Sequence, residues 1–153
     1  MNKPISTKVH GMADYGSAAL LLSAPLIFGY ELDSPEALVP MGLGGMTTVA
    51  SLCTDYEMGV APVISMDTHL TLDVMNGLFL AASPFIFGFA RKGIKSWLPH
   101  VLLGLGEVLI ARMTQSTPRR VGQVAPSIEG RTQLEGYQPR GKRRTSEVLQ
   151  GVH

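Results

Sequence analysis

Four apolar stretches occupy roughly residues 9–30, 36–54, 68–90 and 94–113, and short polar segments separate them. A helix needs about 20 mostly apolar residues, at 1.5 Å each, to cross the core of a bilayer, and all four stretches are close to that length. None shows the helical stripe of charge that marks the outer face of a soluble bundle. The pattern therefore predicts an all-α, polytopic membrane protein with four transmembrane helices. The alternative is a very apolar soluble bundle.

The chain repeats itself at a constant offset of 59 residues, which we call the repeat offset. Residues 5–55 laid on residues 64–114 give 13 identities in 51 positions without a gap. The identical pairs include His10 with His69, Asp14 with Asp73, Pro25 with Pro84, and Pro40 with Pro99. Such a repeat sets the architecture, here two units of two helices each. Because two helices return the chain to its starting side of the membrane, we expect the two units to be parallel.

The repeat divides the chain into five segments. They are an N-terminal lead (1–8), a first two-helix repeat (9–54), an inter-repeat loop (55–67), a second two-helix repeat (68–113) and a C-terminal tail (114–153). The tail is rich in Pro, Gly, Ser, Gln and Arg and poor in aromatic residues, which predicts disorder. Its basic run at 140–144 is expected either to contact anionic lipid headgroups or only to keep the tail soluble.

The net charge of +1 conceals an asymmetry. Residues 1–111 carry five Lys/Arg and nine Asp/Glu, whereas residues 112–153 carry eight and three. Near the helix ends, five Lys/Arg lie on the side of the termini and three lie around 91–95 on the other side. Because cytoplasmic loops carry the excess of Lys and Arg, this bias favours cytoplasmic termini. The first stretch is not expected to be a signal peptide, since it contains Asp14 and no small-residue cleavage site follows it.

Two His/Asp pairs are the first candidates for chemistry. His10 and Asp14, like His69 and Asp73, are four residues apart and so share a helix face. Asp can then accept a hydrogen bond from one imidazole nitrogen and leave the other to bind a metal. Two facing pairs suit zinc, iron or manganese, and the two imidazoles suit the axial positions of a haem. Alternatively, the pairs satisfy each other near the membrane interface and only hold the repeats in register.

Glu107 is the second candidate, because it lies midway along the fourth stretch. A carboxylate there costs about 2.5–3.5 kcal/mol on insertion scales unless it is protonated or paired. An intramembrane acid is by default a candidate functional residue, and the role in question is proton or ion translocation. The alternative is a protonated Glu107 bonded to Thr48, its counterpart in the first repeat, or to a backbone carbonyl. His100 is expected toward the opposite face from His10, outside the same site.

Prolines are expected in two kinds of position. Pro25 and Pro84 should lie inside helices, where each frees the carbonyl four residues back and bends the helix. Pro40 and Pro99 should open the second and fourth helices, in the first turn, where their missing N–H is not needed.

Several function classes find no support in the sequence. There is no Walker motif, CxxC, nucleophile elbow, HExxH or dinucleotide fingerprint. The lone Cys53 excludes an intrachain disulfide. We therefore expect neither an enzyme nor a nucleic-acid-binding protein.

The segment Ala82-Ser-Pro-Phe-Ile-Phe-Gly88, followed by Trp97-Leu-Pro-His100, resembles the SPW repeat family, as does Leu52-Cys-Thr-Asp-Tyr-Glu57 between the halves. The resemblance covers about 7–113. It implies a small bacterial membrane protein with a two-helix repeat and an inner-membrane location, but no established activity and no catalytic residues. Phe85 replaces the family's Trp, so an aromatic anchor is altered here.

The first functional hypothesis is a non-enzymatic scaffold or accessory subunit in the bacterial inner membrane, which binds other membrane proteins or itself. The second is a metal- or haem-binding membrane protein that uses the His/Asp pairs. The third is proton or ion translocation through Glu107. The sequence requires no cofactor.

Overall fold

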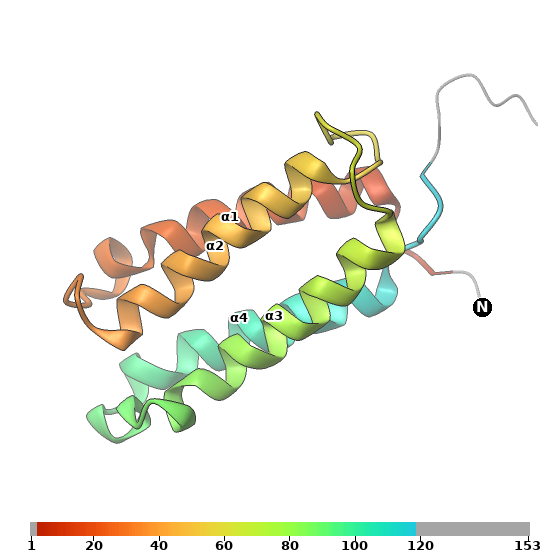
Figure 1. The fold of residues 1–153 in the computed structure, drawn as a ribbon. Coiled ribbons are helices and arrows are strands. Elements are labelled where there is room, and N and C mark those ends of the chain that lie inside the picture. Colours follow the sequence, from red (N-terminus) through yellow and green to blue (C-terminus); the bar gives the residue numbers. More distant parts are fainter. Residues whose placement is uncertain (1–2, 119–153) are drawn as a thin grey trace, which may run out of the picture. The chain divides into compact units, whose positions relative to one another are not determined.

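The computed structural model describes residues 3–118, and these form four α-helices and one short 3-10 helix (Figure 1). The helices are α1 (Thr7–Phe28), α2 (Pro35–Cys53), α3 (Met66–Ile86) and α4 (Ile94–Met113), and the 3-10 helix η1 (Phe89–Lys92) precedes α4. Within this part of the chain there is no strand, only two isolated bridges. The all-α prediction is confirmed. Residues 119–153, most of the predicted disordered tail, lie outside the described residues.

Serine caps begin α1 and α3, the two helices that carry the His/Asp pairs. Ser6 Oγ accepts a hydrogen bond from the Val9 N–H at 3.3 Å, and Ser65 Oγ accepts one from the Thr68 N–H at 3.2 Å. Each bond satisfies one of the N–H groups that a helix start leaves without a partner. The caps set where each helix starts, so both candidate histidines are the fourth residue of their helix.

Pro25 and Pro84 lie inside α1 and α3, as predicted. The prediction that Pro40 and Pro99 open α2 and α4 is wrong, because each is the sixth residue of its helix. In α2 the first position belongs to Pro35, where a missing N–H costs nothing. The four predicted prolines therefore all interrupt a helical hydrogen-bond ladder.

Pro40 and Pro99 each leave one backbone carbonyl without its helical N–H partner. Each of these carbonyls accepts a hydrogen bond from the other helix pair. Glu36 O, four residues before Pro40, accepts a bond from His100 Nε2 of α4 at 3.1 Å. The equivalent carbonyl of α4, that of Lys95, accepts a bond from the Tyr30 hydroxyl at 2.8 Å. Each break in a helix is thus also a point of contact between the α1–α2 pair and the α3–α4 pair.

Glycine allows close packing within each helix pair. A Cβ added to Gly44 of α2 would lie 3.0 Å from the Ala18 carbonyl of α1, and one added to Gly104 of α4 would overlap the Gly77 carbonyl of α3. Small residues of this kind let helices approach closely. The step from Gly44 to Gly104 is one position longer than the repeat offset, and α4, with 20 residues against 19 in α2, is one residue longer.

The outer surface is apolar and much of the interior is polar. Large apolar side chains are exposed on every α-helix, among them Leu26, Met46, Phe79 and Leu105. The buried polar residues inside the helices include His10, Asp14, Thr47, Ser51, His69, Asp73, Asn76, Ser83 and His100. Of the four described α-helices, α1 and α4 are long and apolar enough to cross a bilayer, whereas α2 and α3 fall short of the same measure.

Candidate metal centre

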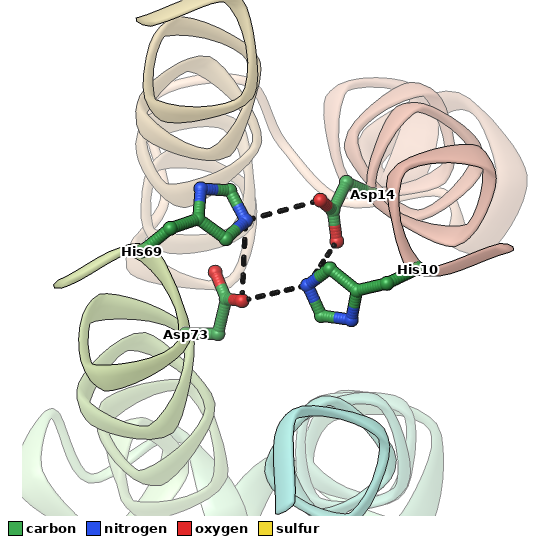
Figure 2. A group of neighbouring side chains, drawn as sticks. All are labelled: His10, Asp14, His69 and Asp73. Atoms are coloured by element: carbon green, nitrogen blue, oxygen red, sulfur yellow. Dashed lines mark hydrogen bonds and ion pairs between the residues drawn. The ribbon is translucent and has the colours of Figure 1, made fainter. Parts of the chain in front are cut away.

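Four buried side chains from α1 and α3 form one cluster. His10 and Asp14 lie one turn apart on α1, and His69 and Asp73 lie one turn apart on α3. None of the four is more than 6% exposed. Figure 2 shows them pointing toward one another. The structure therefore brings together the two pairs that the sequence singled out.

The cluster is a closed ring of four short contacts. His10 Nε2 lies 3.2 Å from Asp14 Oδ1 and 3.0 Å from Asp73 Oδ2 (Figure 2). His69 Nε2 lies 3.0 Å from Asp14 Oδ2 and 3.3 Å from Asp73 Oδ2. Each imidazole thus faces one carboxylate of its own helix and one of the other helix.

The outer imidazole nitrogens are engaged by threonines. His10 Nδ1 lies 2.9 Å from Thr114 Oγ1, and His69 Nδ1 lies 2.8 Å from Thr54 Oγ1. The prediction that Asp supports one nitrogen while the other binds metal is therefore wrong. The carboxylates share the inner side with Nε2, and the supporting groups are hydroxyls. Sequence reasoning missed both threonines because the step from Thr54 to Thr114 is one position longer than the repeat offset.

The two aspartates have different surroundings. Asp14 Oδ2 also accepts a hydrogen bond from Ser51 Oγ at 3.3 Å. Asp73 Oδ1 is buried and has no hydrogen-bond partner among the described residues. Ser51 corresponds to Ala111 of α4 by the same step that links Thr54 to Thr114. The side chain of Ala111 has no hydrogen-bond donor. A buried oxygen without a partner costs free energy. Both ring contacts of Asp73 use Oδ2, so a cation in the ring would relieve Oδ1 if Asp73 bound it through both oxygens.

Two ionised carboxylates in the ring require positive charge. Two carboxylates buried together repel each other and lose their hydration, so they must be compensated. One divalent cation between two neutral imidazoles supplies that charge, and so do two protons on the imidazoles. A tetrahedral ion with bonds of about 2.0–2.1 Å has a ligand–ligand separation of about 3.3 Å. The four contacts of 3.0–3.3 Å are close to that separation, with Asp14 facing the two histidines through different oxygens. One ligand atom from each of the four side chains lies within 4.8 Å of the other three.

Tyr56, in the loop between α2 and α3, covers one side of the cluster. Its ring centroid lies 5.9 Å from that of His69, and the side chain is buried. A Cβ at Gly11 of α1 would overlap this ring, so glycine is what admits the tyrosine. Burial raises the pKa of the Tyr56 hydroxyl above its usual value.

Glu107 and His100 lie outside the cluster. Glu107 Oε1 is buried and has no hydrogen-bond partner within residues 3–118. Thr48 does not supply one, because its hydroxyl donates within its own helix. Thr47 and Glu107 are separated by the same step as Thr54 and Thr114, one position longer than the repeat offset, so Thr47 is the structural counterpart of Glu107. Thr47 Oγ1 is also buried and has no hydrogen-bond partner among the described residues. As predicted, His100 does not join the cluster and donates instead to a carbonyl of α2.

The comparisons with known proteins give one match. A protein-family model described as the SPW repeat domain matches residues 8–114, which include all four cluster residues and both threonines. No curated protein and no solved structure matches the chain. The resemblance noted from the sequence motifs is therefore confirmed.

Proposed function

The chain belongs to the SPW repeat family, and we propose that it is a membrane-embedded protein that binds one divalent transition-metal ion. The observation that carries the proposal is the buried ring of two imidazole Nε2 atoms and two carboxylates, with contacts of 3.0–3.3 Å. Two nitrogen and two oxygen donors suit zinc, ferrous iron or manganese. We assign no catalytic residue.

We infer that all four helices cross the bilayer as two parallel hairpins, α1–α2 and α3–α4. At 1.5 Å per residue, helices of 19 to 22 residues are about 28–33 Å long, close to the thickness of the bilayer core. Apolar side chains face outward and polar ones face inward, which is the reverse of a soluble bundle. Each hairpin then contributes one His and one Asp at the same membrane surface.

The location follows as part of the proposal: a bacterial inner membrane, with both termini in the cytoplasm. Cysteine labelling tests it after Cys53→Ser removes the single native cysteine. A membrane-impermeant maleimide applied to spheroplasts, whose inner membrane is sealed and exposed, should label Lys95→Cys and leave Lys3→Cys unlabelled until the cells are opened. The opposite pattern would reverse the orientation, and labelling of both would argue against two complete hairpins.

A single ion suits the ring better than a haem does. In a bis-imidazole haem the porphyrin occupies the space between the two rings. Here the two carboxylates lie 3.0–3.3 Å from both Nε2 atoms, which is the space a porphyrin would need. The imidazole centroids are 5.5 Å apart, with the ring planes 81° from each other. These distances favour a metal ion with the aspartates as ligands.

Metal analysis tests the proposal. Protein purified in detergent without added metal should contain about one equivalent of a transition metal, or take up one equivalent of zinc, manganese or ferrous iron. His10→Gln and His69→Gln should lose it. His100→Gln is the matched control, because it removes another buried imidazole outside the ring. A parent protein that takes up no metal, or equal losses in all three variants, would refute the proposal.

Proton translocation through Glu107 stays a prediction, supported by the burial of Glu107 Oε1 without a hydrogen-bond partner among the described residues. Glu107→Gln should then abolish proton flux in proteoliposomes that the parent protein supports. The accessory role, with another membrane protein or a second copy as partner, also stays a prediction and is compatible with a metal centre. In-cell crosslinking tests that role.

A further inference from the structure

Two threonines stand in matching places behind the histidines of the ring. Thr54 is the C-cap of α2 and Thr114 is the C-cap of α4, with nearly identical backbone angles of φ −88°, ψ 140° and φ −88°, ψ 139°. They are 1% and 0% exposed. Thr54 contacts His69 of the second hairpin, and Thr114 contacts His10 of the first. Each imidazole is therefore contacted by a hydroxyl from the other hairpin.

The direction of each hydroxyl proton follows from a second contact. Thr54 Oγ1 donates to the Ala50 carbonyl at 2.6 Å, and Thr114 Oγ1 donates to the Ile110 carbonyl at 2.7 Å. These carbonyls lack their usual helical partner, because the N–H of each threonine bonds three residues back, to Ser51 and Ala111. A carbonyl can only accept. The single hydroxyl proton is thus used, and Oγ1 can only accept from the imidazole.

It follows that Nδ1 of both histidines carries a proton. A neutral imidazole has one N–H and one lone pair, so the lone pair must be on Nε2. That nitrogen faces two carboxylate oxygens at 3.0–3.3 Å in both cases. Two such lone pairs directed at ionised carboxylates are repulsive unless a metal cation, or a second proton on each ring, lies between them. The hydroxyls thus leave each imidazole one nitrogen with which to bind a cation.

The backbone holds both threonines in place in the same way. Ile5 N donates to Met113 O at 3.1 Å, and Gln115 N donates to Ile5 O at 2.8 Å, one on each side of Thr114. At Thr54 the corresponding bonds run from Ile64 N to Cys53 O at 3.0 Å and from Asp55 N to Ile64 O at 2.9 Å. Ile5, which precedes the serine cap of α1, therefore holds Thr114 beside His10. Ile64, which precedes the serine cap of α3, holds Thr54 beside His69 in the same way.

We propose that Thr54 and Thr114 are positioning residues, which hold both histidines as the Nδ1–H tautomer and so direct both Nε2 atoms to a divalent transition-metal ion. The inference rests on the proposed function. It adds which nitrogens bind and what selects them. It also makes the site depend on assembly, since neither tautomer is set until the two hairpins meet.

The test combines metal affinity with nitrogen-15 NMR of the histidine rings in the zinc-loaded protein. The parent spectrum should show two imidazoles with zinc on Nε2 and a proton on Nδ1. Thr54→Val and Thr114→Val should weaken zinc binding by about 10–100-fold, the usual cost of losing such a partner. Thr54→Ser and Thr114→Ser, which keep the hydroxyl, should stay close to the parent. Thr48→Val is the matched control, because it removes a similar hydroxyl-to-carbonyl bond, of 2.8 Å, away from any histidine.

The outcomes separate this inference from the proposed function. Zinc on Nδ1 in the parent spectrum overturns the positioning role while metal binding stands. Valine variants with parental affinity do the same. If the valine variants fail to fold, the parent spectrum and the serine variants still decide. A parent protein without zinc binding overturns both.

Discussion

His10 Nε2 and Asp73 Oδ2 lie 3.0 Å apart although the two residues belong to different repeats. His69 Nε2 of the second repeat lies at the same distance, 3.0 Å, from Asp14 Oδ2 of the first repeat. Helices of the same hairpin pack more extensively than helices of different hairpins. The ring therefore joins two helix pairs that pack less extensively against each other than the helices within each pair do.

The first prediction concerns this crossed pair. Asp73→Asn should lower the free energy of unfolding by about 3–5 kcal/mol, because the positive charge that balances the two buried carboxylates is then left with one carboxylate fewer. His10→Gln should cost a similar amount, and the double variant should cost clearly less than the two together. Chemical unfolding in detergent, followed by circular dichroism, measures this coupling.

The control replaces one member of the pair. His100→Gln combined with Asp73→Asn should give additive losses, because His100 bonds to a carbonyl elsewhere. Additive losses for the His10 and Asp73 variants would mean that the two side chains do not depend on each other.

The second prediction concerns the contact between α3 and α4. Gly104→Ala should destabilise the protein by about 1–3 kcal/mol, since the new Cβ would overlap the Gly77 carbonyl and the Ala81 backbone. Gly106→Ala, two residues away in the same helix, meets no atom within 4 Å and should be neutral or slightly stabilising. Thermal unfolding in detergent compares them, and equal effects would contradict the close approach.

The sequence predicted the helices and the histidine–aspartate pairs because these depend on short-range patterns. Apolar stretches give helix lengths, and a spacing of four puts His10 beside Asp14 and His69 beside Asp73. The exact recurrence of that spacing in the second repeat then suggested that the two pairs meet. The structure brings them together.

The supporting threonines were not predictable in the same way. In the gapless alignment Thr54 falls on Met113, so its true counterpart Thr114 is displaced by one position. Packing reveals the displacement, because Gly44 and Gly104 make matching contacts and are displaced from the repeat offset by the same single position. A register change of this kind depends on how α4 packs against α3, and no local sequence pattern reports it.

The third prediction uses the proline-freed carbonyl of Lys95. Tyr30→Phe should cost about 1 kcal/mol, because it removes the hydroxyl that donates to this carbonyl at 2.8 Å. Pro99→Ala restores a backbone N–H for the same carbonyl. Tyr30→Phe should therefore cost less in a Pro99→Ala background than in the parent. Unfolding free energies of the four proteins measure the difference, and an unchanged cost would show that the hydroxyl does not replace the missing N–H.

The fourth prediction concerns alkaline pH. Burial, and after it the charge of Glu36, raises the pKa of the Tyr30 hydroxyl to about 12, against about 10 in an unfolded chain. Between these values the folded chain holds the proton that the unfolded chain releases. The contribution of Tyr30 to stability should therefore be constant below about pH 10 and fall as the pH rises toward 12.

Lys92 acts in the same direction, since its hydrogen bond to Glu36 raises the pKa of its amine. That contribution is present below about pH 10.4, the pKa of an unperturbed lysine, and is lost as the amine deprotonates. Comparing the parent with Tyr30→Phe across pH 9 to 12 isolates the tyrosine, because Lys92 is unchanged in both. The variant should lose less stability over this range, and its ultraviolet titration should lack the tyrosinate step near pH 12 that belongs to Tyr30. Parallel stability curves would show that Tyr30 ionises as freely in the folded chain as in the unfolded one.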